Sequence, residues 1–163
     1  MISQTAEYAL RAVVALAVKP GEPILTRDLA TLTRVPAGYL SKVLQTLGRA
    51  GLVESHHGRG GGFVLARPAE DVTLYDVIQA VDPIQRIRSC PLGLPNHVKL
   101  CPLHKRLDKA MQTVEDAFRE TTLAELLADR SAIKPLCNVA GDEQLNDPVA
   151  RTQSNNRSIP RRI

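Results

Sequence analysis

Residues 28–67, with the sequence DLATLTRVPAGYLSKVLQTLGRAGLVESHHGRGGGFVLAR, constrain the fold of this chain more than any other segment. Their hydrophobic periodicity predicts two short helices separated by a tight turn, with a β-hairpin directly after them. This order is typical of a winged helix-turn-helix domain, which places its second helix in the major groove of DNA. The chain is therefore predicted to be mainly α with a small β-wing, as a winged helix-turn-helix domain plus a long dimerisation helix.

The two helices of this segment carry recognisable start and stop signals. Thr26 is expected to cap the first helix, which places Leu29 and Leu32 on one face. Pro36 is expected at the first position of the second helix, where its missing amide hydrogen leaves no bond unmade. Gly51 is expected to end the second helix in a left-handed conformation. The buried face of that helix is predicted to hold Leu40, Val43, Leu44 and Leu47.

The outward face near the start of the second helix is small, polar and cationic. Recognition helices contact base edges mainly with their N-terminal residues. We therefore expect the major groove or its phosphates to be contacted by Tyr39, Ser41, Lys42 and Gln45.

The expected wing consists of strands 52–55 and 63–66 joined by a glycine-rich tip. His57 and Arg59 in this tip can be positively charged, which suits phosphates or a narrow minor groove. On its own such a tip would indicate only a flexible turn. Directly after a helix-turn-helix, contact between the wing and DNA is the favoured interpretation.

Composition agrees with a compact DNA-binding protein. The chain has 163 residues and a net charge of +4, which fits one domain and permits binding to nucleic acid. Aromatic residues make up 3 % of the chain and tryptophan is absent, which argues against a base-stacking surface for single strands. The apolar run 12–18 is too short to cross a membrane, and no signal peptide is recognisable, so a cytoplasmic protein is expected.

An enzyme is disfavoured by the motifs. The chain shows no nucleophile elbow around its cysteines and histidines, and the glycines of residues 58–62 lie in a hairpin with no helix after them. A winged fold used only for protein–protein contact is the other alternative. The cationic recognition face argues against it.

A long helix is expected from Leu103 to about Arg119, with a charged outer face and an apolar stripe at spacings of three and four. The stripe comprises Leu103, Leu107, Ala110, Met111, Val114, Ala117 and Phe118. A helix remote from the recognition helix suits a dimer interface, although a helix packed on its own domain would show the same pattern.

Start and stop signals divide the chain into four parts. An opening helix over 3–18 and a helix capped by Thr73 belong to the first part, and Thr122 is expected to cap a last short helix in the third. The parts are a winged helix-turn-helix DNA-binding domain (1–83), a sensor or cofactor loop (84–102), the dimerisation helix with a short following helix (103–136), and a tail expected to be disordered (137–163).

The chain resembles the BadM/Rrf family of winged-helix regulators over roughly residues 1–130. The matching segments include AEYALRA (6–12), VPAGYLSKVLQ (35–45), GGFVLARP (61–68), VTLYDVI (72–78) and CPLH (101–104). The resemblance implies a homodimeric transcription factor, often a repressor. Two recognition helices on one dimer should engage two half-sites, so a near-palindromic operator in double-stranded DNA is expected. In many members the resemblance also implies an iron–sulfur cluster and subunits paired through the long helix.

The resemblance also implies a ligand set, from which this chain departs. Cluster-binding members supply three cysteines from the loop before the dimerisation helix, and here only the outer two, Cys90 and Cys101, are present. His97 is the closest stand-in for the missing middle cysteine, and His104 matches a histidine that completes the set in some members. Glu7 lies where some relatives donate a carboxylate, in certain cases from the partner subunit. A [2Fe–2S] cluster on Cys90, Cys101, His104 and either Glu7 or His97 is the favoured interpretation.

Three other interpretations stay open from the residues alone. Two cysteines and two histidines also satisfy tetrahedral zinc, the two cysteines could form a redox-switching disulfide, or the loop could hold no cofactor. Cys137 lies beyond the loop and is expected to be a free thiol. In each case the site is expected to flank the hinge between the DNA-binding domain and the dimerisation helix.

Overall fold

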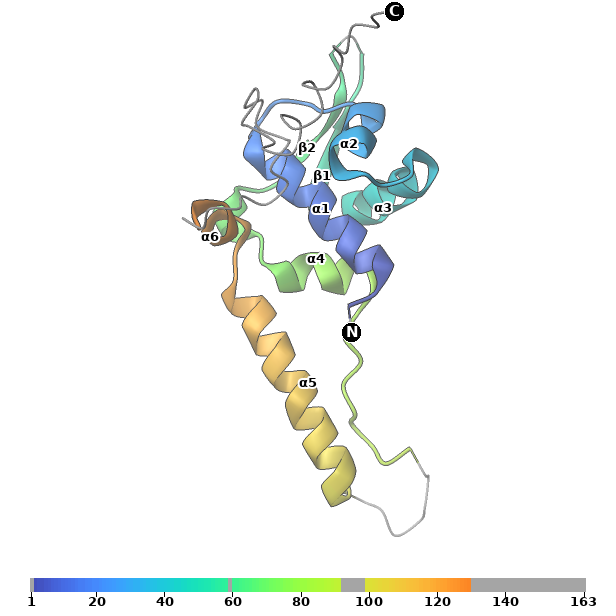
Figure 1. Ribbon diagram of the computed structural model, residues 1–163, viewed down its shortest axis with the longest axis vertical. Coiled ribbons are helices and arrows are strands. Elements are labelled where there is room, and N and C mark those ends of the chain that lie inside the picture. Colours follow the sequence, from blue (N-terminus) through green and yellow to red (C-terminus); the bar gives the residue numbers. More distant parts are fainter. Residues whose placement is uncertain (1, 59, 92–98, 130–163) are drawn as a thin grey trace, which may run out of the picture.

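The computed structural model describes residues 2–58, 60–91 and 99–129. The elements of this part are α1 (Gln4–Val18), α2 (Thr26–Thr33), α3 (Ala37–Arg49), β1 (Val53–His56), β2 (Gly62–Leu65), the 3-10 helix η1 (Ala69–Asp71), α4 (Leu74–Val81), α5 (Pro102–Glu120) and α6 (Leu123–Ala128). The predicted fold class, mainly helical with a small two-stranded wing, is confirmed. Figure 1 shows α5 projecting from a head that the other elements form.

Helices α2 and α3 form the predicted helix-turn-helix, but α2 begins one residue earlier than expected and α3 begins one residue later. Leu25, not Thr26, is the N-cap of α2, because its extended backbone presents the carbonyl that accepts the Leu29 N–H at 2.9 Å. Pro36 is likewise the N-cap of α3 and not its first residue, and its carbonyl accepts the Leu40 N–H at 2.9 Å. In both cases the backbone carbonyl starts the helix without a side-chain cap.

Two left-handed residues end these helices. Arg34, at φ 54°, turns the chain after α2, and the Val35 N–H then reaches the Ala30 carbonyl at 3.1 Å. Gly51, at φ 69°, ends α3 as predicted, and the next amide, Leu52 N–H, bonds to the Leu47 carbonyl at 3.0 Å. The turn between α2 and α3 is therefore tight enough to pack both helices on α1.

The core of the head lies between α1, α3 and the wing. Residues 12–17 of α1 are all buried, so this helix is enclosed on most of its circumference. The largest fully buried side chains are Leu16, Leu29, Leu40, Leu44, Leu47, Leu52 and Leu123. Burial of each leucine stabilises the head by about 1.5–3 kcal/mol relative to exposure. The predicted buried face of α3 is confirmed.

The wing is an antiparallel pair, β1 and β2, with Val53 opposite Leu65. Its base is fixed to the segment before α2, because Ile24 and Phe63 exchange backbone hydrogen bonds of 3.0 and 2.9 Å. Gly62 allows this approach: a Cβ at that position would lie 2.5 Å from the Ile24 carbonyl carbon, and its φ is +154°. The base of the wing therefore requires glycine.

The long helix joins the head at its C-terminal end. The Leu74 N–H bonds to the Thr121 carbonyl at 3.0 Å and the Leu123 N–H bonds to the Val72 carbonyl at 2.9 Å, which ties the end of α5 to the start of α4. Capping boxes at Thr73 and Thr122, both predicted, open the two helices that flank this junction. None of the helices in the described ranges is both long and apolar enough to cross a membrane.

Candidate functional site

The first three turns of α3 present the surface expected to contact DNA. Lys42 and Gln45 are exposed, and Tyr39 is 40 % exposed. Ser41 is half-buried and its hydroxyl donates to the Ala37 carbonyl at 3.0 Å, so it offers a lone pair more readily than a proton. The four predicted residues thus lie within the first nine residues of α3, and each is at least partly exposed.

Tyr39 is held by α1 in a way that the sequence did not indicate. Its ring meets the Tyr8 ring edge-on, with centroids 5.5 Å apart, and its hydroxyl hydrogen-bonds to Thr5. The Arg11 guanidinium lies over the Tyr8 ring, 5.8 Å from its centroid, and donates to the Thr33 carbonyl at 3.2 Å. Helix α1 therefore supports both the start of α3 and the turn before it.

The wing also carries exposed side chains that were expected to contact DNA. His56 and His57 are exposed at the end of β1 and directly after it. Arg59 lies outside the described residues, so its predicted contact with DNA stays a prediction.

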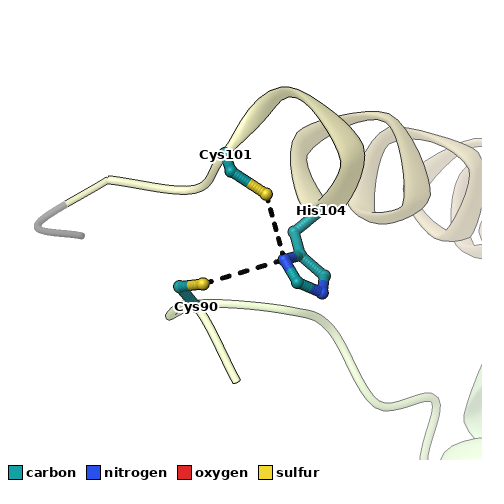
Figure 2. A group of neighbouring side chains, drawn as sticks. All are labelled: Cys90, Cys101 and His104. Atoms are coloured by element: carbon teal, nitrogen blue, oxygen red, sulfur yellow. Dashed lines mark hydrogen bonds between the residues drawn. The ribbon is translucent and has the colours of Figure 1, made fainter. Parts of the chain in front are cut away.

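A second site lies at the start of α5, where two thiols converge on one imidazole. His104 Nδ1 is 3.2 Å from Cys101 Sγ and 3.8 Å from Cys90 Sγ (Figure 2). The ligand atoms of all three residues lie within 4.8 Å of one another. Cys90 comes from a segment of the chain separate from the one that carries Cys101 and His104. Cys90 is buried, whereas Cys101 and His104 are half-buried.

Local helix geometry explains how two of these residues meet. Cys101 is the N-cap of α5 in an extended conformation, and its carbonyl accepts the Lys105 N–H at 2.9 Å. Pro102 takes the first helical position, where proline is favoured. His104 follows within the first turn, so its ring lies beside the Cys101 thiol.

Ion pairs attach the segment carrying Cys90 to α5. The Arg86 guanidinium donates two hydrogen bonds to Asp108, at 2.7 and 2.8 Å, and a third to Glu115 at 3.3 Å. The hydrogen bonds from Arg86 lower the pKa of Asp108, and those from Arg119 and then Arg86 lower the pKa of Glu115. Both carboxylates are therefore charged at neutral pH. The pairing of Arg86 with Asp108 is not visible in the sequence, because residues 22 apart give no periodic signal.

The expected position of this site is wrong, and the roles expected of Glu7, His97 and Cys137 stay predictions. The site does not lie beside the junction between α5 and the head of the same chain. It lies at the N-terminal, free end of α5, and the C-terminal end of α5 joins the head (Figure 1). Within the described residues Glu7 is not in the group, and its carboxylate pairs with Arg11 at 2.6 Å. His97 and Cys137 lie outside the described residues, and the roles predicted for them stay predictions.

The donor set suits a thiophilic metal. Ligands on one tetrahedral ion with bonds of about 2.0–2.3 Å lie about 3.3–3.8 Å apart, close to the two sulfur–nitrogen separations given above. Thiolate and imidazole donors suit zinc and iron–sulfur clusters alike. Both need a fourth ligand in addition to the three residues that the structure brings together.

These features define a winged helix-turn-helix DNA-binding protein with a thiol–imidazole site on a projecting helix. The chain belongs to the Rrf2 family, described as iron-dependent transcriptional regulators, whose model matches residues 2–129. It is therefore a DNA-binding transcriptional regulator and not an enzyme, as the sequence analysis predicted.

Individual relatives agree with this assignment. A Mycobacterium tuberculosis protein provisionally named an HTH-type transcriptional regulator is 37 % identical over 131 residues, covering 77 % of this chain and 80 % of its own. The HTH-type transcriptional regulator NsrR of Bacillus licheniformis is 29 % identical over 134 residues, covering 80 % and 94 %. The predicted resemblance to the family is confirmed.

Solved structures show the same architecture. IscR of T. potens has a TM-score of 0.67 at 26 % identity, over 80 % of this chain and 88 % of its own. CymR, the global cysteine regulator of B. subtilis, has a TM-score of 0.64 at 26 % identity, over 77 % and 95 %.

Proposed function

We propose that this regulator acts as a homodimeric repressor whose affinity for a near-palindromic operator depends on the state of the Cys90–Cys101–His104 site. The convergence of two thiols on one imidazole, at the start of a helix with an exposed apolar stripe, carries the proposal. Lys42 and Gln45 on α3 and the wing residues His57 and Arg59 supply the contacts to DNA.

The stripe on α5 supports the homodimer. All 19 residues of α5 are described and none of them is buried. Even the large apolar side chains of Leu103, Leu107 and Val114 are 63, 48 and 49 % exposed. An apolar cavity of about 550 Å³ adjoins the stripe, between α1, the segment after α4 and the side chains of Met111 and Val114. Apolar surface of this extent is unfavourable in water unless another chain covers it. A second α5 has a matching stripe.

A [2Fe–2S] cluster is the ligand that we favour at the site. The family description names iron, and this chain resembles both NsrR and IscR. Cys90, Cys101 and His104 would bind it, with the fourth position filled by His97 or by Glu7 of the partner subunit. Such a cluster would supply a reversible, oxidant-sensitive link between two segments of the loop and α5. One thiolate fewer predicts a cluster that is lost more easily.

Zinc is the second candidate, and one observation favours it. The three ligand atoms lie within 4.8 Å of one another, as on a single ion, whereas a two-iron cluster distributes its protein ligands over two metals. A tetrahedral zinc ion would hold the loop rigidly, and the zinc-bound protein would be colourless.

Anaerobic reconstitution with iron and sulfide separates these ligands. We expect a coloured protein with two irons per chain, determined by absorption and metal analysis, that bleaches in air. Cys90→Ala and Cys101→Ala should abolish the colour, and Cys137→Ala is the matched control that should keep it. A colourless protein with one zinc per chain would mean that the site binds zinc and not an iron–sulfur cluster. An iron- and zinc-free protein whose operator affinity is unchanged in both variants would exclude the site as the sensor.

A further inference from the structure

The segment carrying Cys90 contacts α5 through one ionic group that lies outside the ligand set. Arg86 donates to both carboxylate oxygens of Asp108, at 2.7 and 2.8 Å, in a two-bond fork. The next backbone amide, Ile87 N–H, donates to Asp108 Oδ1 at 3.0 Å. A single carboxylate on α5 thus holds both the side chain and the backbone of the segment before Cys90.

The positions of these residues relative to the thiols are regular. Arg86 precedes Cys90 by four residues, and Asp108 follows His104 by four, about one helical turn. The ion pair and the Cys90–His104 contact are therefore two neighbouring attachments between the same two segments. In Figure 1 the segment after α4 runs alongside α5 towards its free end.

A third residue extends the attachment towards the head. Glu115 accepts from Arg86 at 3.3 Å and from Arg119 at 2.7 Å, and the Arg119 guanidinium stacks 3.4 Å above the Tyr75 ring on α4. The side chains of Arg86, Asp108 and Glu115 are 26, 20 and 13 % exposed. An isolated ion pair on the surface contributes little to stability. The Arg86–Asp108 pair differs, because it has two parallel hydrogen bonds, shares Arg86 with Glu115 and is partly buried.

We propose that Arg86 and Asp108 are positioning residues that set the separation of Cys90 from Cys101 and His104. The clamp, defined as the Arg86–Asp108 pair with the Ile87 amide, orders this segment before any ligand binds. The inference rests on the proposed function only in taking the three side chains as a ligand site. Partners that orient metal ligands typically change metal affinity by 10–100-fold when they are removed.

A metal-free measurement tests the clamp directly. In a Cys137→Ala background, oxidised glutathione converts the Cys90 and Cys101 thiols into one disulfide and is itself reduced to two glutathione thiols. The equilibrium constant reports how closely the two thiols are held. We expect Arg86→Gln to lower it about tenfold, because the segment is no longer ordered. Arg88→Gln removes the same charge from an exposed neighbour and should leave it within about twofold.

Two further variants separate geometry from charge. Arg86→Lys keeps the charge but cannot form the fork, so it should fall between the wild type and Arg86→Gln. The double variant Arg86→Asp, Asp108→Arg exchanges the partners and should recover part of the loss seen in either single variant. A purely structural defect in α5 would not be rescued by the exchange. Circular dichroism of each variant checks that the head is folded.

The rate at which a chelator removes metal from the reconstituted protein gives a second readout, expected to rise about tenfold in Arg86→Gln. If the wild type binds no metal but Arg86→Gln still lowers the disulfide equilibrium constant, the clamp stands and the proposed metal function fails. If Arg86→Gln and Arg88→Gln both match the wild type in that equilibrium, the clamp is wrong. Equal losses in both variants, without rescue by the exchange, would also overturn it, since net charge would then be the cause.

Discussion

The head and the arm, defined as α5 with residues 84–91, are stabilised by different means. The head encloses α1 and buries the largest leucines of the described chain, whereas α5 buries none of its residues. The arm is attached by ion pairs and exposes an apolar stripe. The head therefore has the contacts of an independently folded unit. The arm needs a second surface to cover its stripe, and its attachment depends on charge.

The strongest test of this contrast places a charge on the exposed stripe. Val114→Glu should weaken the dimer by about 3–5 kcal/mol, or about 10²–10⁴-fold, because a carboxylate at an apolar interface has no partner. Operator binding should fall with it, while the melting temperature of the head is unchanged. Light scattering and calorimetry measure the two effects. Thr113→Glu, at an exposed position off the stripe, is the control, and a dimeric Val114→Glu would place the interface elsewhere.

The stability of the head should be most sensitive to substitution at Gly62, where two backbone segments approach most closely. Gly62→Ala forces a Cβ against the Ile24 backbone and a side chain into a glycine conformation, which costs about 1–3 kcal/mol in strain alone. Denaturant unfolding should show this loss, with the dimer interface unaffected in the folded protein. Gly38→Ala meets nothing within 4 Å and should stabilise α3 by about 0.5–1 kcal/mol. If Gly62→Ala and Gly38→Ala had the same free energy of unfolding, the close approach of Gly62 to Ile24 would not contribute to the stability of the head.

DNA affinity should depend on the head far more than on the arm. Lys42→Ala and Arg59→Ala should each weaken binding to duplex and reduce its logarithmic salt dependence by about one unit, because one phosphate contact is lost. Lys109→Ala removes an equal charge from an exposed position on α5 and should change neither. Fluorescence anisotropy over a salt series gives all three values. A salt dependence that all variants share would argue against the recognition face.

The attachment of the arm should weaken in acid. Asp108 and Glu115 have lowered pKa values because of Arg86 and Arg119, so their contribution to stability is complete above the ordinary carboxyl pKa of about 4. It is lost as the pH falls through the lowered values, since protonation then breaks the pairs. Carboxyl NMR titration should show an Asp108 midpoint that returns to the ordinary range in Arg86→Gln. A midpoint equal in both proteins would mean that the pair does not form in solution.

Much of the head could be predicted from the sequence, because local signals specify it. Periodic leucines, Gly51 and the two capping boxes gave the helices, and helix starts were misplaced by one residue where a carbonyl acts as the cap. Contacts between distant segments gave no such signal. The edge-on packing of Tyr39 on Tyr8 and the fork between Arg86 and Asp108 depend on tertiary packing. The pairing of Glu7 with Arg11, at a spacing of four, was visible in the sequence but was not identified.

The attachment of α5 at its C-terminal end makes this helix a lever with the thiol–imidazole site at its tip. Nineteen residues span about 28 Å, so a tilt of about 5° at the junction with α4 displaces the tip by about 2.4 Å. Such a lever works in both directions. Whatever factor a ligand at the tip applies to operator affinity, the operator applies to the affinity for that ligand. A regulator bound to its operator is thus a different sensor from the same regulator free in solution.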